Sequence, residues 1–144
     1  MPKSTSICNS GLALLYNATA WANIADNAAA SPATNIYMAL HTASLAGAST
    51  QATTETAYTN YARVAVARTT GGWSAPASGA TSNVAAVEFA QCGVTGGTIT
   101  TASTGKAASG AGIIFHYGDL NASIAVSNQI QPRFPAAAVT ITET

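Results

Sequence analysis

Two stretches of the chain, residues 36–41 and 61–68, alternate between apolar and polar or small side chains. The apolar positions are Ile36, Met38 and Leu40 in the first stretch and Ala62, Val64 and Val66 in the second. A period of two is that of a β-strand with one buried face. The pattern therefore predicts two strands, each with one apolar face and one mixed face.

The connection between these strands, residues 43–60, is rich in Thr, Ser, Ala and Gly. It is too long for a tight β-hairpin turn, and only residues 53–58 have the composition of a helical turn. We expect an ordered loop of this length to be held by a partner outside the chain.

A helical pattern precedes the first strand. Apolar side chains recur every three or four residues from Leu12 to about Ala25, which predicts a helix over that range. Asn9 or Ser10 is the expected N-cap, because both side chains can accept a hydrogen bond from the first turn. The apolar stripe consists of Leu14, Ala18, Trp21 and Ala25.

Short apolar or β-branched runs separated by turn residues fill the rest of the chain. We expect strands at 84–89, 98–101, 112–117, 120–126 and 138–142. Residues 130–134 are expected to be an edge strand or a connecting segment, because Pro132 and Pro135 disfavour a central strand. Residues 103–112 are small and are expected to be flexible. The continuous apolar run 112–117 predicts a strand covered on both faces, and Gly118-Asp119 predicts a tight turn.

One helix followed by seven or eight short strands is typical of an all-β sandwich or barrel. A chain of 144 residues forms one domain of ordinary size. We therefore expect a single domain over residues 1–144, with an N-terminal arm and helix at 1–34 and a β-sandwich at 35–144.

Charge is sparse in this sequence. Only 7% of residues are charged, and five basic and five acidic residues cancel. No electrostatic field then attracts nucleic acid or a membrane surface, so neither is an expected partner. A surface with so few ions suggests that an assembly covers much of it. No apolar run has the roughly 20 residues of a membrane span or the core of a signal peptide, so we expect no export by that route.

The titratable and nucleophilic side chains show no catalytic pattern. His41 and His116 are expected to be structural, and no motif of a nucleophile elbow, zinc site or phosphate loop is present. We therefore expect no enzyme, no cofactor and no metal. A sugar-active enzyme would need paired carboxylates, for example Asp119 and Glu88 facing each other in a cleft. The acidic residues are otherwise isolated: Asp26, Glu55, Glu88, Asp119 and Glu143.

Cys8 and Cys92 are isolated in the sequence. Two buried free thiols and one disulfide between them are both open, and the absence of any paired spacing favours free thiols.

Aromatic and basic side chains gather at the start of the second strand. Tyr58, Tyr61 and Arg63 could hold the long loop from within the chain, or could contact a neighbouring subunit, because Tyr and Arg are enriched at interface centres. Trp73, in the following loop, is a further interface candidate.

Several blocks of the sequence resemble small structural proteins of tailed-phage virions, of the capsid cement or decoration type, some of which are described as tail or fibre proteins. The blocks are Ile36–Ala43, Gly47 with Thr50, Glu55 with Ala57 and Tyr58, Tyr61–Val66, Val87–Phe89, Leu120, Ala125–Asn128, Pro132–Phe134 and Val139–Glu143.

The resemblance implies a role in the virion. We expect a jelly-roll-like β-sandwich, made in the cytoplasm of the host bacterium, that binds the outer capsid surface and cements neighbouring copies of the major capsid protein. It would act as a homo-oligomer, a dimer or trimer, on the capsid. The alternative is a tail-fibre or receptor-binding module of the virion.

Overall fold

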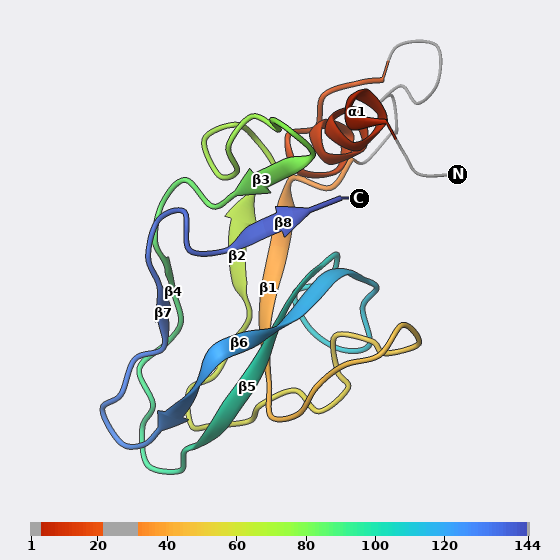
Figure 1. Cartoon of the computed structure of the whole chain (residues 1–144). Helices are drawn as coiled ribbons and strands as arrows, with labels where there is room; N and C mark the ends of the chain where they lie inside the picture. The colour runs from red at the N-terminus through yellow and green to blue at the C-terminus, as the bar shows by residue number, and fades with distance from the viewer. Residues whose placement is uncertain (1–3, 22–31, 144) are drawn as a thin grey trace. The chain divides into compact units, whose positions relative to one another are not determined.

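A computed structural model of the chain describes residues 4–21 and 32–143 (Figure 1). These residues contain one helix and eight strands, which confirms the expected count. The elements are α1 (Thr5–Tyr16), β1 (Asn35–His41), β2 (Val64–Ala67), β3 (Ala80–Ser82), β4 (Val87–Glu88), β5 (Gly97–Gly105), β6 (Ile114–Val126), β7 (Arg133–Phe134) and β8 (Thr140–Thr142).

The strands form one four-stranded sheet of order β2-β1-β5-β6 and two two-stranded sheets, β3-β8 and β4-β7. The pairs β1-β5, β5-β6 and β3-β8 are antiparallel. These sheets confirm an all-β fold with one N-terminal helix, and they are compatible with a β-sandwich. The strand order does not confirm the jelly-roll connectivity.

The chain divides into two compact units that alternate along the sequence. The first unit comprises Met1–Asn35, Val66–Val87 and Phe134–Thr144, and the second comprises Ile36–Ala65 and Glu88–Arg133. Neither unit is one continuous segment. The single-domain organisation expected from the sequence stays a prediction.

Helix α1 lies in the first unit. Its predicted bounds, from Leu12 to about Ala25, were wrong. It begins at Thr5, and Ser4 is the N-cap, since its hydroxyl accepts a hydrogen bond from the Ile7 N–H at 3.3 Å. The side chain of Asn9, an expected cap, instead accepts a hydrogen bond from the Gly79 N–H. The helix ends at Tyr16, and residues 22–25 of the predicted range lie outside the described part of the chain.

The buried face of α1 carries Cys8, Leu12 and Tyr16, spaced four residues apart on one side of the helix. The ring of Tyr16 packs edge-on against Trp73 at a centroid distance of 4.8 Å, and both side chains are fully buried. Helix α1 also packs against β3, which pairs with β8. Trp73 is therefore a core residue of the first unit.

The side chain of Arg68 caps the C-terminal end of α1. Its guanidinium donates hydrogen bonds to the carbonyl oxygens of Leu14 and Leu15 in the last helical turn, and to that of Ala33. Leu14 and Leu15 lie in the last turn of α1, where helix carbonyls lack partners further along the helix and carry the negative end of its dipole. Burial of the Arg68 guanidinium lowers its pKa, because burial disfavours the charged form.

Strands β1 and β5 form the centre of the second unit. Met38 pairs with Thr104 and Leu40 with Ala102, in one continuous antiparallel register. The apolar side chains Ile36, Met38 and Leu40 are fully buried, as the alternation predicted. The second predicted strand is shorter than expected, because β2 begins only at Val64 and Ala62 is exposed before it.

The region between residues 103 and 126 differs most from the sequence-based expectation. Residues 103–105, expected to be flexible, end β5 and are buried. Gly118 and Asp119, expected to form a turn, lie within the 13-residue strand β6 and pair with Ala102 and Thr101. The expectation that residues 112–117 are covered on both faces was also wrong, because Ile113 is 66% exposed.

Contacts within the second unit hold the loop 43–60, so no outside partner is required to order it. Gln51 is fully buried, its amide nitrogen donates to the Tyr37 carbonyl, and its side-chain oxygen accepts from the Ala107 N–H. Ser44 donates to the carboxylate of Asp119 in β6 at 3.0 Å. The local turn comprises residues 51–54 and not 53–58 as expected.

Candidate functional site

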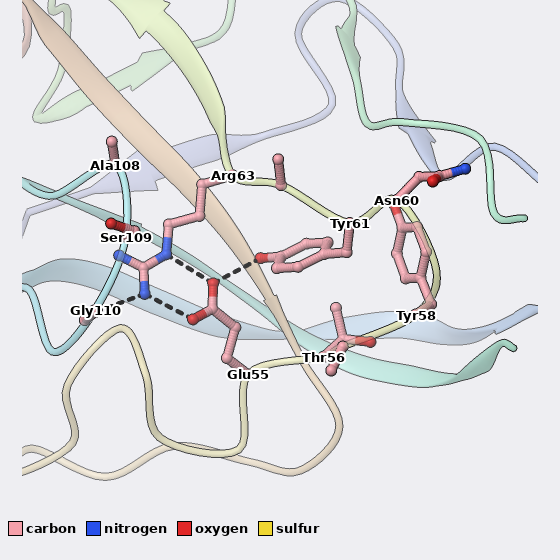
Figure 2. Close-up of a pocket in the computed structure, with 11 residues that line it drawn as sticks. Glu55, Thr56, Tyr58, Asn60, Tyr61, Arg63, Ala108, Ser109 and Gly110 are labelled. Carbon is pink, nitrogen blue, oxygen red and sulfur yellow. Dashed lines mark hydrogen bonds and ion pairs between the residues drawn. The ribbon is translucent and has the colours of Figure 1, made fainter.

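A pocket of about 550 Å³ opens in the second unit between two segments of the chain (Figure 2). The first segment, residues 55–63, leads from the long loop to the start of β2. The second, residues 108–110, belongs to the connection between β5 and β6. The lining residues are Glu55, Thr56, Ala57, Tyr58, Asn60, Tyr61, Ala62, Arg63, Ala108, Ser109 and Gly110.

An ion pair between Glu55 and Arg63 lies at this pocket. Arg63 Nε donates to Glu55 Oε1 and Arg63 Nη2 to Glu55 Oε2, each at 2.7 Å, in a two-pronged geometry. The Arg63 side chain is only 1% exposed and that of Glu55 is 18% exposed. The hydrogen bond and the charge of Glu55 raise the pKa of Arg63.

The same guanidinium joins the two segments that form the pocket. Arg63 Nη1 donates to the Ala107 carbonyl at 2.9 Å, and Nη2 donates to the Gly110 carbonyl at 2.7 Å. Four of the five N–H donors of Arg63 are thus engaged. Both walls are fixed through one buried group.

Tyr61 is held by its hydroxyl. The hydroxyl donates to Glu55 Oε1 at 2.9 Å and accepts from the Leu40 N–H at 3.0 Å, which ties the pocket to strand β1. Burial is the largest cause of the raised pKa of Tyr61, since it disfavours the phenolate. The hydroxyl therefore stays a hydrogen-bond donor at neutral pH.

Aromatic rings support Tyr61 from two sides. Tyr58 packs edge-on against it at a centroid distance of 5.3 Å, and Phe89 lies parallel to it at 6.2 Å. The hydroxyl of Tyr58 donates to the Ala90 carbonyl, and burial raises its pKa to about 12. Both tyrosines are therefore fixed in position and neutral.

Three of the four predicted interface residues, Tyr58, Tyr61 and Arg63, meet at this pocket. Trp73 does not join them, because it is buried in the core of the first unit. The contacts of the three clustered residues hold the loop from within the chain. A contact of any of the four with a neighbouring subunit stays a prediction.

His41 is a structural residue, as the sequence predicted. The ring is fully buried, with Nδ1 at 2.8 Å from the Thr53 carbonyl and Nε2 at 2.8 Å from the Ser103 hydroxyl. A carbonyl only accepts, so Nδ1 carries the proton and Nε2 accepts from Ser103. Burial lowers the pKa of His41 and favours this neutral form. His116, in β6, is half-buried.

The two acidic residues that would suit a sugar-active enzyme do not line the pocket. Glu88 forms an exposed ion pair with Arg133 at 2.9 Å. Asp119 accepts hydrogen bonds from the hydroxyls of Thr101 and Ser44, which lower its pKa. Within residues 4–21 and 32–143, no three His, Cys, Asp or Glu side chains gather as a metal site would require.

Sequence reasoning missed the second wall of the pocket. Residues 108–110 are small, and nothing in their composition marks them as partners of Arg63. In the sequence, Glu55 has no neighbouring carboxylate and no basic residue within seven positions, so it looks isolated. The sequence offers one indication of this pair, the spacing of eight positions between Glu55 and Arg63. A loop of that length can fold back and bring the carboxylate next to the guanidinium.

A family model described as Podophage GP4 fiber I protein gp80 matches residues 14–142. This range includes both segments of the pocket and nearly the whole chain. The chain belongs to this family. Membership in the gp80 family supports a phage virion structural protein, in agreement with the resemblance noted in the sequence. No curated protein matches the chain.

The gp80 family description names a fibre and not a capsid cement protein. It therefore agrees better with the tail-fibre alternative than with the capsid-cement prediction. In the described part of this gp80 family member, no helix combines the length and apolar character needed to cross a membrane.

Proposed function

We propose that this chain is a structural subunit of a fibre in the virion of a short-tailed phage. The observation that carries the proposal is the family match over residues 14–142, whose description names a podophage fibre protein. A structural role without catalysis agrees with the pocket, where the one carboxylate is neutralised by Arg63. The capsid-cement function has no comparable support.

Two properties of the chain suit a subunit packed among other virion proteins. The surface bears few ions, and interfaces are depleted of charged residues at their centres. The long loop 43–60 is fixed by contacts within its own unit, so it can meet a partner without a large loss of conformational entropy. Its partners would be further copies of this chain and neighbouring fibre or tail proteins.

Localisation on the intact particle tests the proposal. An epitope inserted beside Val94, which is 83% exposed in the connection between β4 and β5 and lies outside the loop 43–60, can be labelled with gold and imaged by electron microscopy. We expect label at the tail. Label distributed over the head would instead favour the capsid-cement function, and particles without label would contradict a place in the virion. Untagged phage provides the control for non-specific labelling.

A further inference from the structure

We propose that the pocket between residues 55–63 and 108–110 binds a neutral saccharide. The inference extends the proposed function, and it rests on that function for the source of the saccharide, the surface of the bacterium that a fibre meets. The pocket itself is argued from its charge, its hydrogen-bonding groups and its rigidity.

The charge of the pocket favours an uncharged ligand. Among its lining residues only Glu55 and Arg63 carry charge, and they neutralise each other through two hydrogen bonds of 2.7 Å. An anionic ligand would have to displace Glu55 from Arg63, and a cationic ligand would have to displace Arg63 from Glu55. Breaking such a buried, two-pronged pair is unfavourable, so ions of either sign are disfavoured.

The polar groups that face the pocket suit hydroxyls, which both donate and accept. Glu55 Oε2 accepts one hydrogen bond from Arg63 and keeps acceptor capacity, and its side chain is 18% exposed. Asn60 and Ser109 are exposed on the rim. The amide nitrogen of Asn60 donates to the Gln91 carbonyl, and the amide points away from Glu55 and Arg63 (Figure 2). Hydroxyls of a ligand would therefore meet mainly Glu55 and Ser109.

The pocket is preorganised and of suitable size. The Arg63 guanidinium fixes both walls, and the Tyr61 hydroxyl is held by Glu55 (Figure 2). The rings of Tyr58 and Phe89 also pack against Tyr61. A rigid site loses little entropy on binding, which matters for weak ligands such as sugars. Its volume of about 550 Å³ lies within the range of small-molecule sites, roughly 300 to 1,000 Å³.

Saturation-transfer NMR on the full chain tests the proposal. The probes are neutral disaccharides of hexoses, 6-deoxyhexoses and N-acetylhexosamines, together with the matched uronic-acid disaccharides. We expect at least one neutral sugar to bind with a dissociation constant on the order of 1 mM, and its acidic analogue to bind more weakly. A chain that binds no neutral sugar, or prefers the acidic set, would overturn the proposal.

Two matched tryptophan substitutions locate the binding. Ser109→Trp fills the rim of the pocket, and Ala48→Trp places the same side chain at an exposed loop position outside the pocket lining. Ser109→Trp should weaken binding at least about tenfold and Ala48→Trp should leave it unchanged. Equal binding by the two variants would place the sugar elsewhere. Should Ser109→Trp fail to fold, Ala57→Trp fills the same pocket from the other segment.

Presentation of the sugar distinguishes its source. The same measurement is made with the free disaccharide and with bacterial surface polysaccharide immobilised on beads. Retention on the polysaccharide that is lost in Ser109→Trp supports a cell-surface ligand, and binding of the free sugar alone supports a soluble one. Localisation at the tail without sugar binding would refute this inference and leave the proposed function intact. Sugar binding by a protein located on the head would refute the proposed fibre function and leave the sugar-binding inference for this pocket intact.

Discussion

Two arginines form ion pairs in very different surroundings. The Arg63 side chain is 1% exposed and pairs with Glu55, whereas that of Arg133 is 57% exposed and pairs with Glu88. Arg63→Ala leaves a carboxylate without its partner, so we expect the free energy of unfolding to fall by about 3 kcal/mol. Arg133→Ala should cost less than about 1 kcal/mol, because water screens an exposed pair. Urea denaturation of both variants measures the difference, and equal losses would contradict it.

The lowered pKa of His41 makes the stability of the folded protein decrease as the pH falls. Burial lowers the pKa in the folded chain, so the unfolded chain binds a proton at higher pH. Stability is fully present above the unfolded value of about 6.5 and decreases as the pH falls toward the lowered folded value. We expect the melting temperature of the native chain to fall between pH 7 and pH 5.

The variant His41→Asn should flatten this decrease, because the buried titratable group is removed. His116→Asn, which removes the half-buried histidine of β6, is the matched control and should retain the decrease. Thermal melts followed by circular dichroism measure both. A native-like pH profile in His41→Asn would show that another group is responsible. The lowered pKa of Asp119 acts in a separate window, below about pH 4.

Residue-level prediction from the sequence succeeded where the partners are local. Tyr58, Tyr61 and Arg63 were identified as one cluster because they are close in sequence. The carbonyls of Ala107 and Gly110, which Arg63 also binds, lie 44 and 47 residues further along the chain. Every residue has a backbone carbonyl, so the sequence does not show which carbonyls bind Arg63. Only the folded structure identifies them.

At the scale of elements, strand β5 contains two glycines with different surroundings. A Cβ at Gly105 would lie 2.3 Å from Gln51 Cδ and 2.5 Å from the Ile113 carbonyl oxygen, whereas a Cβ at Gly97 has open space. We expect Gly105→Ala to lower the free energy of unfolding by about 2 kcal/mol through overpacking. Gly97→Ala should change it by less than about 0.5 kcal/mol. Chemical denaturation measures the free energy of unfolding of both variants. A Gly105→Ala variant as stable as the native chain would show that the Gln51 side chain can move to make room for the methyl group.

Arg68 stabilises the end of helix α1. Arg68→Met keeps much of the side-chain volume and removes the donors to Leu14 and Leu15, so we expect a loss of about 2 kcal/mol. The amides of the last turn should then exchange with solvent faster. Ser4→Ala, at the other end of the helix, should cost about 1 kcal/mol and affect the first turn. Hydrogen exchange by NMR resolves the two ends, and unchanged last-turn exchange in Arg68→Met would contradict the capping role.

Strand alternation predicted β1 and the buried positions of Ile36, Met38 and Leu40 correctly. It failed in β6, because Gly118 and Asp119 have strong turn preferences in isolation. In the folded chain both residues pair with β5, and Asp119 accepts a hydrogen bond from the side chain of its partner Thr101 at 2.6 Å. Tertiary pairing thus overrides the local preference, and sequence alone does not contain that pairing.

For the whole molecule, the sequence blocks predicted the class of protein better than the position within the virion. Their resemblance indicated a phage virion structural protein, and the family match agrees. The choice between head and tail depends on which surface meets which partner. Neither the alternation of apolar residues nor the fold contains that information, because similar sheets serve many assemblies.

The two cysteines make it possible to test whether the two units of the chain unfold together. Both are free and buried, Cys8 in the first unit and Cys92 in the second, so the disulfide alternative was wrong. The units alternate through five segments, and neither is a continuous piece of chain that could fold first. We therefore expect the units to unfold in one transition, as a single domain does.

Thiol labelling along a urea gradient, read by mass spectrometry of the two cysteine peptides, measures this directly. Both thiols should be protected in the native chain and should become reactive at the same urea concentration, with two thiols counted after denaturation without reductant. Cys8→Ser and Cys92→Ser give the midpoint of each remaining thiol alone and serve as controls for any effect of the label. Separate midpoints for Cys8 and Cys92 would mean that the units unfold independently, and a count of zero would mean that the thiols are oxidised.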